Sequence, residues 1–419
     1  MSPFTAESLL RRQISVTGQF RVDDDTLSPS YIPAPPPLLD EATAIVQAWL
    51  RFVHLQPVEK PSTIYAQFMP AKLILAMIKC APSEQGKQNT ISEALFTLVG
   101  NGGSDPLSIS SLEDLVGRTR NWRDQSTEIL KPAVARLQML GKEILDCLLL
   151  PLKACGYKTP AVRLVISQGL RARHAPDQDQ GTFMRLEGLR NKLMARDGCR
   201  CVVSGLLDYS QNRNKSIDDS FDLPDNFGDV DEEPDDAVYE QVEGAHILPH
   251  ALNSISEGFE LDKKSAHVWT VANIFCPGLS DLVMREQING PQNGMLLTHN
   301  LHVHFGALRL WFTATDQPNE YVVGPNSVLS HSGINSAPGR HLVRFEDHSG
   351  KQISLPNPRL LAFHRACCLV LRASGAGDYI EEILDKFGRI GVLSSDGSST
   401  EMLDHILHTV AHSTLVRWD

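Results

Sequence analysis

The sequence predicts an α+β fold that is mostly α-helical, with a helical N-terminal domain, a smaller mixed unit and C-terminal helices. Apolar residues recur at three- and four-residue steps between residues 41 and 156, which is typical of packed helices. Strand, turn and helix patterns then follow one another between residues 242 and 306. Because 419 residues are too many for one small core, we expect two or three domains.

Residues 1–40 are expected to form a flexible, proline-rich lead-in, because the run YIPAPPPLLD favours an extended polyproline-like conformation. Asp40 is placed to cap the first helix, which begins at residue 41. A second helix is predicted over residues 64–80 with a kink at Pro70, and a third from Thr90. The apolar face of the first helix consists of Ala42, Ile45, Val46, Trp49, Leu50 and Val53.

The strongest periodicity of the chain lies between residues 110 and 156, and Gly156 is suited to end the last helix there. Residues 41–156 therefore form a predicted helical domain, followed by a linker over residues 157–182. The domain has no catalytic cluster in its sequence. It is either a partner surface or, as we expect, a self-contained core. Its periodic apolar residues are Val134, Leu137, Leu140, Ile144, Leu148 and Leu152.

After a helix over residues 183–195, an acidic insertion interrupts the mixed unit between residues 208 and 240. With few apolar anchors, this segment is predicted to be disordered or mobile. A calcium loop would need a defined alternation of ligands with glycine and a terminal glutamate, so a solvated loop is the better interpretation. Its carboxylates include Asp218, Asp219, Asp222, Asp225, Asp229, Asp231, Glu232, Glu233, Asp235 and Asp236.

Three residues are the candidate catalytic residues. His246 follows a short strand-like run, Asn293 stands in a Pro-Gln-Asn-Gly turn, and His302 lies nine residues later in a helix-like run. A single histidine after an apolar strand is more often structural than catalytic. Two histidines and an Asn-Gly turn, joined by strand, turn and helix signals, favour a functional site.

Three stretches carry a family resemblance: RDGCRCVVSG at residues 196–205, VEGAHILPH at residues 242–250 and NGPQNGMLLTHNLHVHFGALRLWF at residues 289–312. Their order and context resemble the HNH nuclease family, and in detail its large fungal branch. The resemblance implies a ββα-metal (HNH-like) domain over residues 183–325. It also implies that His246 is the general base, Asn293 orients the hairpin and His302 binds a metal. The implied cofactor is a divalent metal, Mg²⁺ or Mn²⁺, with Zn²⁺ as an alternative.

Two positions depart from the family's pattern. Ala245 stands where many members have an aspartate or histidine as a second metal ligand, and Gly306 stands where an acidic residue or histidine often completes the site. Glu243, His299 and His304 are the candidates to replace those ligands. As the simpler alternative, His299 and His304 are exposed polar residues of the helix.

Three functions are compatible with this pattern. The first is a metal-dependent endonuclease that hydrolyses phosphodiester bonds in DNA. The second is the same scaffold reused as an acid–base catalyst, such as a cyclase or isomerase of fungal secondary-metabolite biosynthesis, with His246 moving protons. The third is a non-catalytic interaction protein.

The charge and the cysteines limit the partners and the compartment. A net charge of −11 argues against strong DNA binding, since phosphate contacts require a basic face, and leaves a small-molecule substrate as the alternative. No signal peptide or membrane segment is recognised, which favours a cytoplasmic or nuclear protein. Cys199 and Cys201 are expected on a strand of the core, because a zinc site would need a second pair.

A local basic patch is the strongest sequence feature in favour of phosphate contacts. Its members are equally compatible with a solvated helix face. They are Arg185, Arg190, Lys192, Arg196 and Arg200.

Residues 326–419 are predicted to form an extension of strands and helices. The alternating run at residues 341–346 is typical of a strand, as is the run at residues 320–323 just before the extension. Asn357 and Pro358 occupy the cap and first positions of a following helix. Two shorter helices are expected over residues 379–387 and 400–412.

Overall fold

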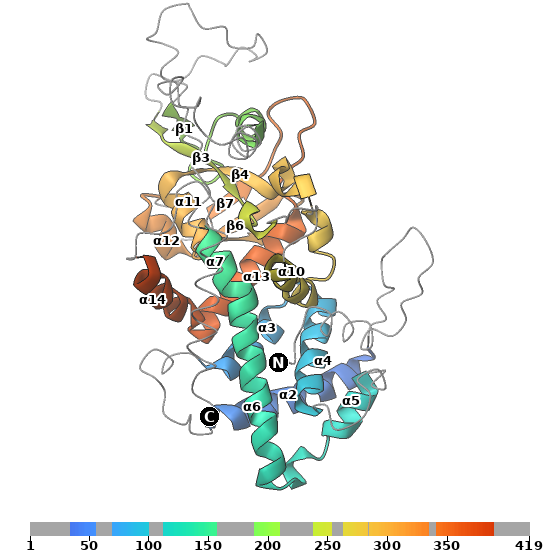
Figure 1. Ribbon diagram of the computed structural model, residues 1–419. Helices are drawn as coiled ribbons and strands as arrows, with labels where there is room; N and C mark the ends of the chain where they lie inside the picture. Colours follow the sequence, from blue (N-terminus) through green and yellow to red (C-terminus); the bar gives the residue numbers. More distant parts are fainter. Residues whose placement is uncertain are drawn as a thin grey trace, which may run out of the picture. The chain divides into compact units, whose positions relative to one another are not determined.

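The computed structural model describes residues 34–55, 69–99, 112–156, 188–209, 238–253, 263–283, 285–334 and 341–388. These residues are mostly helical, as predicted, and carry small sheets (Figure 1). The predicted linker, the acidic insertion over residues 210–237, most of the lead-in and the helix at 400–412 lie outside the described residues.

The chain divides into two compact units, each described here by itself. Unit 1 takes its residues from Met1–Cys155, Ala251–Met284 and Ala366–Asp419. Unit 2 takes its residues from Gly156–His250 and Arg285–Arg365. None of the helices in the described ranges has the length and apolar character needed to cross a bilayer.

Unit 1 is helical. Helix α6 packs on α3 and α4, while α2 packs on α3, α4 and α5, and α10 packs on α4. Its helices are α2 (Pro36–Leu55), α3 (Pro70–Cys80), α4 (Glu84–Val99), α5 (Leu112–Thr119), α6 (Thr127–Ile144), α7 (Leu150–Gly156), α10 (Lys263–Phe275) and α14 (Ala376–Gly388). A π-helical turn, η3 (Leu145–Leu149), joins α6 to α7.

The apolar faces predicted for this unit are confirmed. All six residues predicted on the first helix are buried, with Ala42 and Val46 fully inaccessible. From the periodic stretch, Leu137 and Leu148 are also fully inaccessible, whereas Val134 is half-buried. The periodicity thus located the core of unit 1 correctly.

The predicted starts of these helices are wrong. Helix α2 begins at Pro36, so Asp40 lies inside it rather than at its cap. Helix α3 begins at Pro70, which causes no kink because a proline at the first helical position sacrifices an N–H that has no helical partner. Helix α4 begins at Glu84, and Thr90 lies within it with its hydroxyl donating to the carbonyl of Gly86.

Unit 2 combines a helix over residues 188–196 with three small sheets among its described residues. Strand β1 (Leu207–Asp208) pairs in parallel with β2 (Tyr239–Glu240). Strands β5 (Trp311–Ala314), β6 (Glu320–Gly324) and β7 (His341–Arg344) form an antiparallel sheet in that order. Strands β6 and β7 were predicted, whereas β5 was not.

The central motif of unit 2 consists of two antiparallel strands and a helix. Strand β3 (Val242–His246) pairs with β4 (Gly294–Thr298) in a register that places Val242 opposite Thr298 and His246 opposite Gly294. Thr298 caps α11 (His299–Gly306), which follows β4 directly and packs on both strands. This is the ββα arrangement that the sequence predicts.

Two further local predictions have opposite outcomes. The cap of α13 (Pro358–Ser374) is confirmed, since Asn357 Oδ1 accepts the N–H of Arg359 at 2.9 Å. Cys199 and Cys201 are buried as expected, but they do not lie on a strand. Cys199 has φ +56°, a left-handed conformation that belongs to the turn after the 188–196 helix.

Candidate functional site

Asn293 fixes the loop that follows β3. Its side chain is fully buried. The amide oxygen accepts the N–H of Leu248 at 2.9 Å, and the amide nitrogen donates to the carbonyls of Leu248 at 2.9 Å and Ile288 at 2.8 Å. Its own carbonyl accepts the N–H of Ile247 at 2.8 Å. Asn293 thereby joins both ends of the hairpin and sets the direction of the chain beside His246.

Close packing at the first residue of β4 requires a glycine. A Cβ atom on Gly294 would lie 3.1 Å from Leu193 Cδ1 and 3.3 Å from the carbonyl oxygen of Ala245. The Asn-Gly pair of the motif therefore combines two roles, an amide that ties the loop and a residue without a side chain where the strands approach the 188–196 helix.

Arg196 is a structural anchor of the same turn. Its side chain is fully buried and forms a two-point ion pair with Asp197, with nitrogen–oxygen distances of 2.6 and 3.0 Å. The remaining guanidinium protons reach three backbone carbonyls, those of Pro291, Gly294 and Ser354, at 2.7–3.0 Å. Asp197 in turn accepts the N–H of Leu296 at 2.9 Å.

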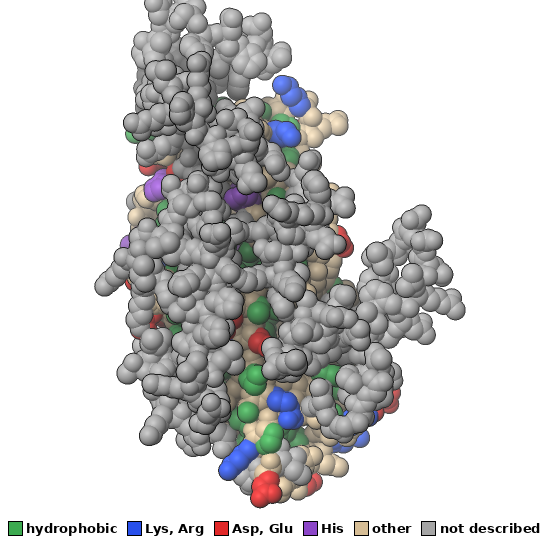
Figure 2. Space-filling view, viewed as in Figure 1, with side chains coloured by type: hydrophobic (Ala, Val, Ile, Leu, Met, Phe, Trp, Pro, Cys, Tyr) green, Lys and Arg blue, Asp and Glu red, His purple; other side chains and the backbone are tan. Residues whose placement is uncertain are grey.

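The proposed basic patch is therefore largely absent from the surface. Arg196 is satisfied inside the unit, and Arg190 pairs with Asp208 at 3.1 Å with only 11% of its side chain exposed. Lys192 and Arg200 are exposed, and Arg185 lies outside the described residues. On the face drawn in Figure 2, the described Lys and Arg side chains form small separate groups beside acidic and apolar ones.

His246 is buried at the end of β3, with 6% of its surface exposed. Its Nε2 lies 3.0 Å from Asn289 Oδ1. Because an amide oxygen only accepts, Nε2 carries the proton and Nδ1 carries the unshared electron pair. That Nδ1 atom is buried and finds no hydrogen-bond partner within the described part of the chain. A buried polar atom without a partner is rare outside functional sites.

The environment keeps His246 neutral. Burial, with smaller effects from His250 and His302, lowers the pKa of His246 to about 3, although the hydrogen bond from Asn289 opposes the shift. The ring of His250 has its centroid 6.0 Å from that of His246. At neutral pH the imidazole of His246 therefore offers an electron pair at Nδ1.

Glu243 connects β3 to α11. It is buried, with 6% of its surface exposed, and its Oε2 lies 2.7 Å from Nδ1 of His302. Its Oε1 receives Nδ1 of His299 at 3.0 Å and a hydrogen bond from Gln241 at 2.9 Å. Burial raises the pKa of Glu243, but the hydrogen bonds from His302 and His299 prevail and lower it below its usual range.

The divalent metal implied by the resemblance does not fit the side chains that the structure describes. Both carboxylate oxygens of Glu243 are engaged by imidazole N–H groups. Neither Ala245 nor Gly306 offers a donor side chain. Within the described ranges, no three His, Cys, Asp or Glu side chains are arranged to hold a metal ion. Mg²⁺ and Mn²⁺ prefer several oxygen ligands, so His302 alone is a poor site for them.

The five predicted site residues thus fall into two groups. His246, Asn293, His302 and Glu243 all belong to the ββα motif and its loop. His304, the fifth, lies on α11 with its Nδ1 buried and, among the described residues, without a hydrogen-bond partner. His299 is 57% exposed at its side chain, as expected, although it also contacts Glu243.

Asn289 was not predicted as a site residue. The sequence INGPQNG contains two Asn-Gly pairs, and only the second was recognised. Since Asn-Gly marks turns, the first pair was an available signal that Asn289 would lie in the same loop cluster. Its contact with His246 spans 43 residues of sequence, so the pairing itself needed the fold.

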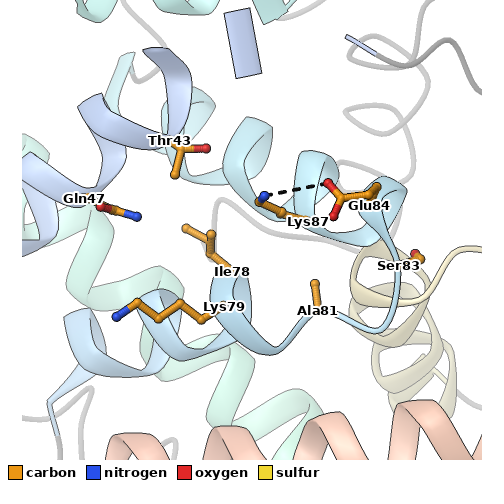
Figure 3. A pocket seen from close by; sticks show the side chains of 8 residues that line it. All are labelled: Thr43, Gln47, Ile78, Lys79, Ala81, Ser83, Glu84 and Lys87. Atoms are coloured by element: carbon orange, nitrogen blue, oxygen red, sulfur yellow. Dashed lines mark ion pairs between the residues drawn. The ribbon is translucent and has the colours of Figure 1, made fainter. Parts of the chain in front are cut away.

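A separate cavity lies in unit 1 and contains none of the predicted site residues. It has a volume of ≈ 270 Å³ and is lined by residues of α2, α3, α4 and the α3–α4 loop (Figure 3). Two lysines face it, and Lys87 pairs with Glu84 at 3.7 Å. Ligand sites are mostly apolar and begin at about 300 Å³, so this small polar hollow is a weaker candidate than the ββα motif.

Low pH is expected to destabilise unit 2 through its buried histidines. Burial lowers the pKa of His364 to about 4, although its hydrogen bond to the Phe305 carbonyl opposes the shift, and His246 is lowered to about 3. Both rings are neutral in the folded state, whereas in the unfolded chain they bind protons near pH 6.5. The stabilisation is thus complete above pH 6.5 and declines as pH falls toward 3–4.

The expected slope is about 1.4 kcal/mol of unfolding free energy per pH unit for each histidine, or about 2.7 kcal/mol for both, between roughly pH 6 and 4. Urea denaturation of the full chain at pH 7.5, 6.0 and 5.0 measures it. His364→Leu should remove about half of the slope. A variant with the slope of the parent would show that His364 titrates normally in the fold.

Comparison with known proteins places the motif in a family context. The family model described as HNH endonuclease matches residues 201–313, which is well under half of the chain but includes His246, Asn293, His302, β3, β4 and α11. No curated protein and no solved structure matches the chain.

Proposed function

We propose that the HNH endonuclease domain at residues 201–313 hydrolyses phosphodiester bonds in DNA, with His246 as the general base. One observation carries the proposal: the buried, neutral His246 has its Nε2 held by Asn289 and its Nδ1 unpartnered among the described residues. Nδ1 would take a proton from a water molecule. The resulting hydroxide would attack phosphorus, the P–O ester bond would break, and the leaving oxygen would take a proton from solvent.

A phosphate substrate would also correct the low basicity of this ring. With a pKa near 3, free His246 is neutral but a weak base. An anion bound beside the ring favours the imidazolium and so raises the pKa toward neutrality. A neutral substrate would not have this effect. The domain thus suits an anionic diester better than an uncharged molecule.

The test is a plasmid-nicking assay with the purified full chain. Supercoiled plasmid is incubated with the protein in Mg²⁺, Mn²⁺ or Zn²⁺, or with a chelator, and relaxed and linear products are quantified. We expect conversion to relaxed plasmid in at least one condition. Bis(p-nitrophenyl) phosphate serves as a small diester probe in parallel. No turnover of plasmid or diester in any condition would contradict the proposal.

A second candidate function is acid–base catalysis on a small molecule, such as a cyclisation or isomerisation in fungal secondary-metabolite biosynthesis. The donor set favours it, since the described side chains do not form a metal site, and so does the net charge of −11. Metabolite profiles of the native host carrying wild-type or His246→Ala protein test this candidate. Identical profiles would eliminate it, and loss of a defined product without any nicking activity would favour it over the nuclease.

A further inference from the structure

We propose that Glu243 is a positioning residue that holds His302 in the form protonated at Nδ1, so that the unshared electron pair of Nε2 faces the reaction site and accepts a hydrogen bond from the attacking water. This inference rests on the proposed function above for the identity of the reaction. The orientation of His302 itself rests only on contacts within the ββα motif.

The tautomer follows from the chemistry of the pair. Glu243 Oε2 lies 2.7 Å from Nδ1 of His302, and both side chains are buried, with 6% and 8% exposed. An ionised carboxylate offers no proton, so Nδ1 must donate. The neutral imidazole then has its electron pair at Nε2. A water molecule is a suitable partner for that atom because it can donate an O–H.

The same carboxylate explains why a glutamate is needed. Its second oxygen accepts from His299 at 3.0 Å and from Gln241 at 2.9 Å, so the group is fixed at both ends. A fixed carboxylate restrains the His302 ring on α11 relative to β3, the strand that ends in His246. His302 and His246 are also near enough for each charge to affect the other, since His302 contributes to the lowered pKa of His246.

The two histidines then have complementary roles. Nδ1 of His246 removes one proton of the water, while Nε2 of His302 accepts the hydrogen bond of the other and directs the oxygen electron pair at phosphorus. Placing a nucleophile in this way lowers the entropic part of the barrier. His302 thereby acts without a metal, which agrees with the lack of a three-ligand group in the described part of the chain.

Nitrogen NMR of the full chain, labelled with ¹⁵N in the histidine rings, tests the tautomer. His302→Gln assigns the signals of His302. At pH 7.5 the wild type should show a protonated Nδ1 and an unprotonated Nε2 for this residue. Glu243→Gln, which offers an amide in place of one carboxylate oxygen, should move both signals toward a mixture of tautomers. His299→Gln removes the exposed partner of Glu243 and should leave the His302 signals in place.

Nicking kinetics provide the second readout. Glu243→Gln should lower kcat by about 10- to 100-fold, as expected when the partner of a functional histidine is removed, with KM changed much less. A wild-type His302 protonated at Nε2, or signals unchanged in Glu243→Gln, would overturn the proposal. If Glu243→Gln does not fold, the wild-type spectrum still decides. Because the NMR arm needs no substrate, absence of nicking in the wild type would contradict only the proposed function.

Discussion

His246→Ala should lower the rate of plasmid nicking by about 10²- to 10⁴-fold, the usual contribution of a general base. The imidazole electron pair at Nδ1 is the group that takes the proton from water, and alanine offers no replacement. Since His246 lies at the end of β3 with a buried ring, its loss also leaves a space of the size of imidazole. Free imidazole in the buffer should therefore restore part of the rate.

A matched control separates this effect from damage to the loop. His250→Gln removes the neighbouring ring, whose centroid is 6.0 Å from that of His246, and leaves the hydrogen bond between His246 and Asn289 in place. Its rate should stay close to that of the parent. Nicking by His246→Ala at the parent rate, with folding verified by circular dichroism, would remove His246 from the mechanism.

The pH dependence of nicking gives an independent check on the same residue. Burial lowers the pKa of His246 to about 3, so the free enzyme has its base in the active form throughout the range from pH 5 to 8. We thus expect kcat/KM, which reports the free enzyme, to show no loss attributable to this histidine as pH falls to 5. A decline centred near pH 6.5 would indicate an ordinary solvated imidazole.

The sequence was sufficient for features that depend on local pattern. Helical periodicity identified the buried face of α2, because residues three and four apart share one side of a helix. The hairpin and α11 were predicted from a strand-like run, an Asn-Gly turn and a helical run, each readable within a dozen residues. Helix starts were less predictable, since Pro36 and Pro70 fit both an extended lead-in and a first helical position.

Features that depend on distant contacts were not predictable. Arg196 was interpreted as part of a basic surface, as its composition suggests. Its partners Pro291, Gly294 and Ser354 are 95, 98 and 158 residues away in sequence. Glu243 was expected as a possible metal ligand because a carboxylate near a histidine allows that role. Only the fold shows that both of its oxygens accept from histidines.

Removing the Arg196 side chain should cost about 3–5 kcal/mol of unfolding free energy, because it leaves Asp197 as a buried carboxylate without its counter-ion. Arg196→Met is the informative variant, since methionine fills part of the space. It also deprives three backbone carbonyls of their donor. Because two of these, Pro291 and Gly294, flank the Asn293 turn, nicking should fall together with stability.

The double variant Arg196→Met, Asp197→Leu tests the cause. Replacing both partners removes the unpaired charge, so the double variant should be more stable than Arg196→Met alone, although the loss of the carbonyl contacts remains. Arg200→Ala is the surface control, and it should change the free energy by less than about 0.5 kcal/mol. Urea denaturation of the four proteins measures these differences. If Arg196→Met is as stable as the parent but nicks poorly, then Arg196 contacts the substrate, and the phosphate-binding role first assigned to it would be restored.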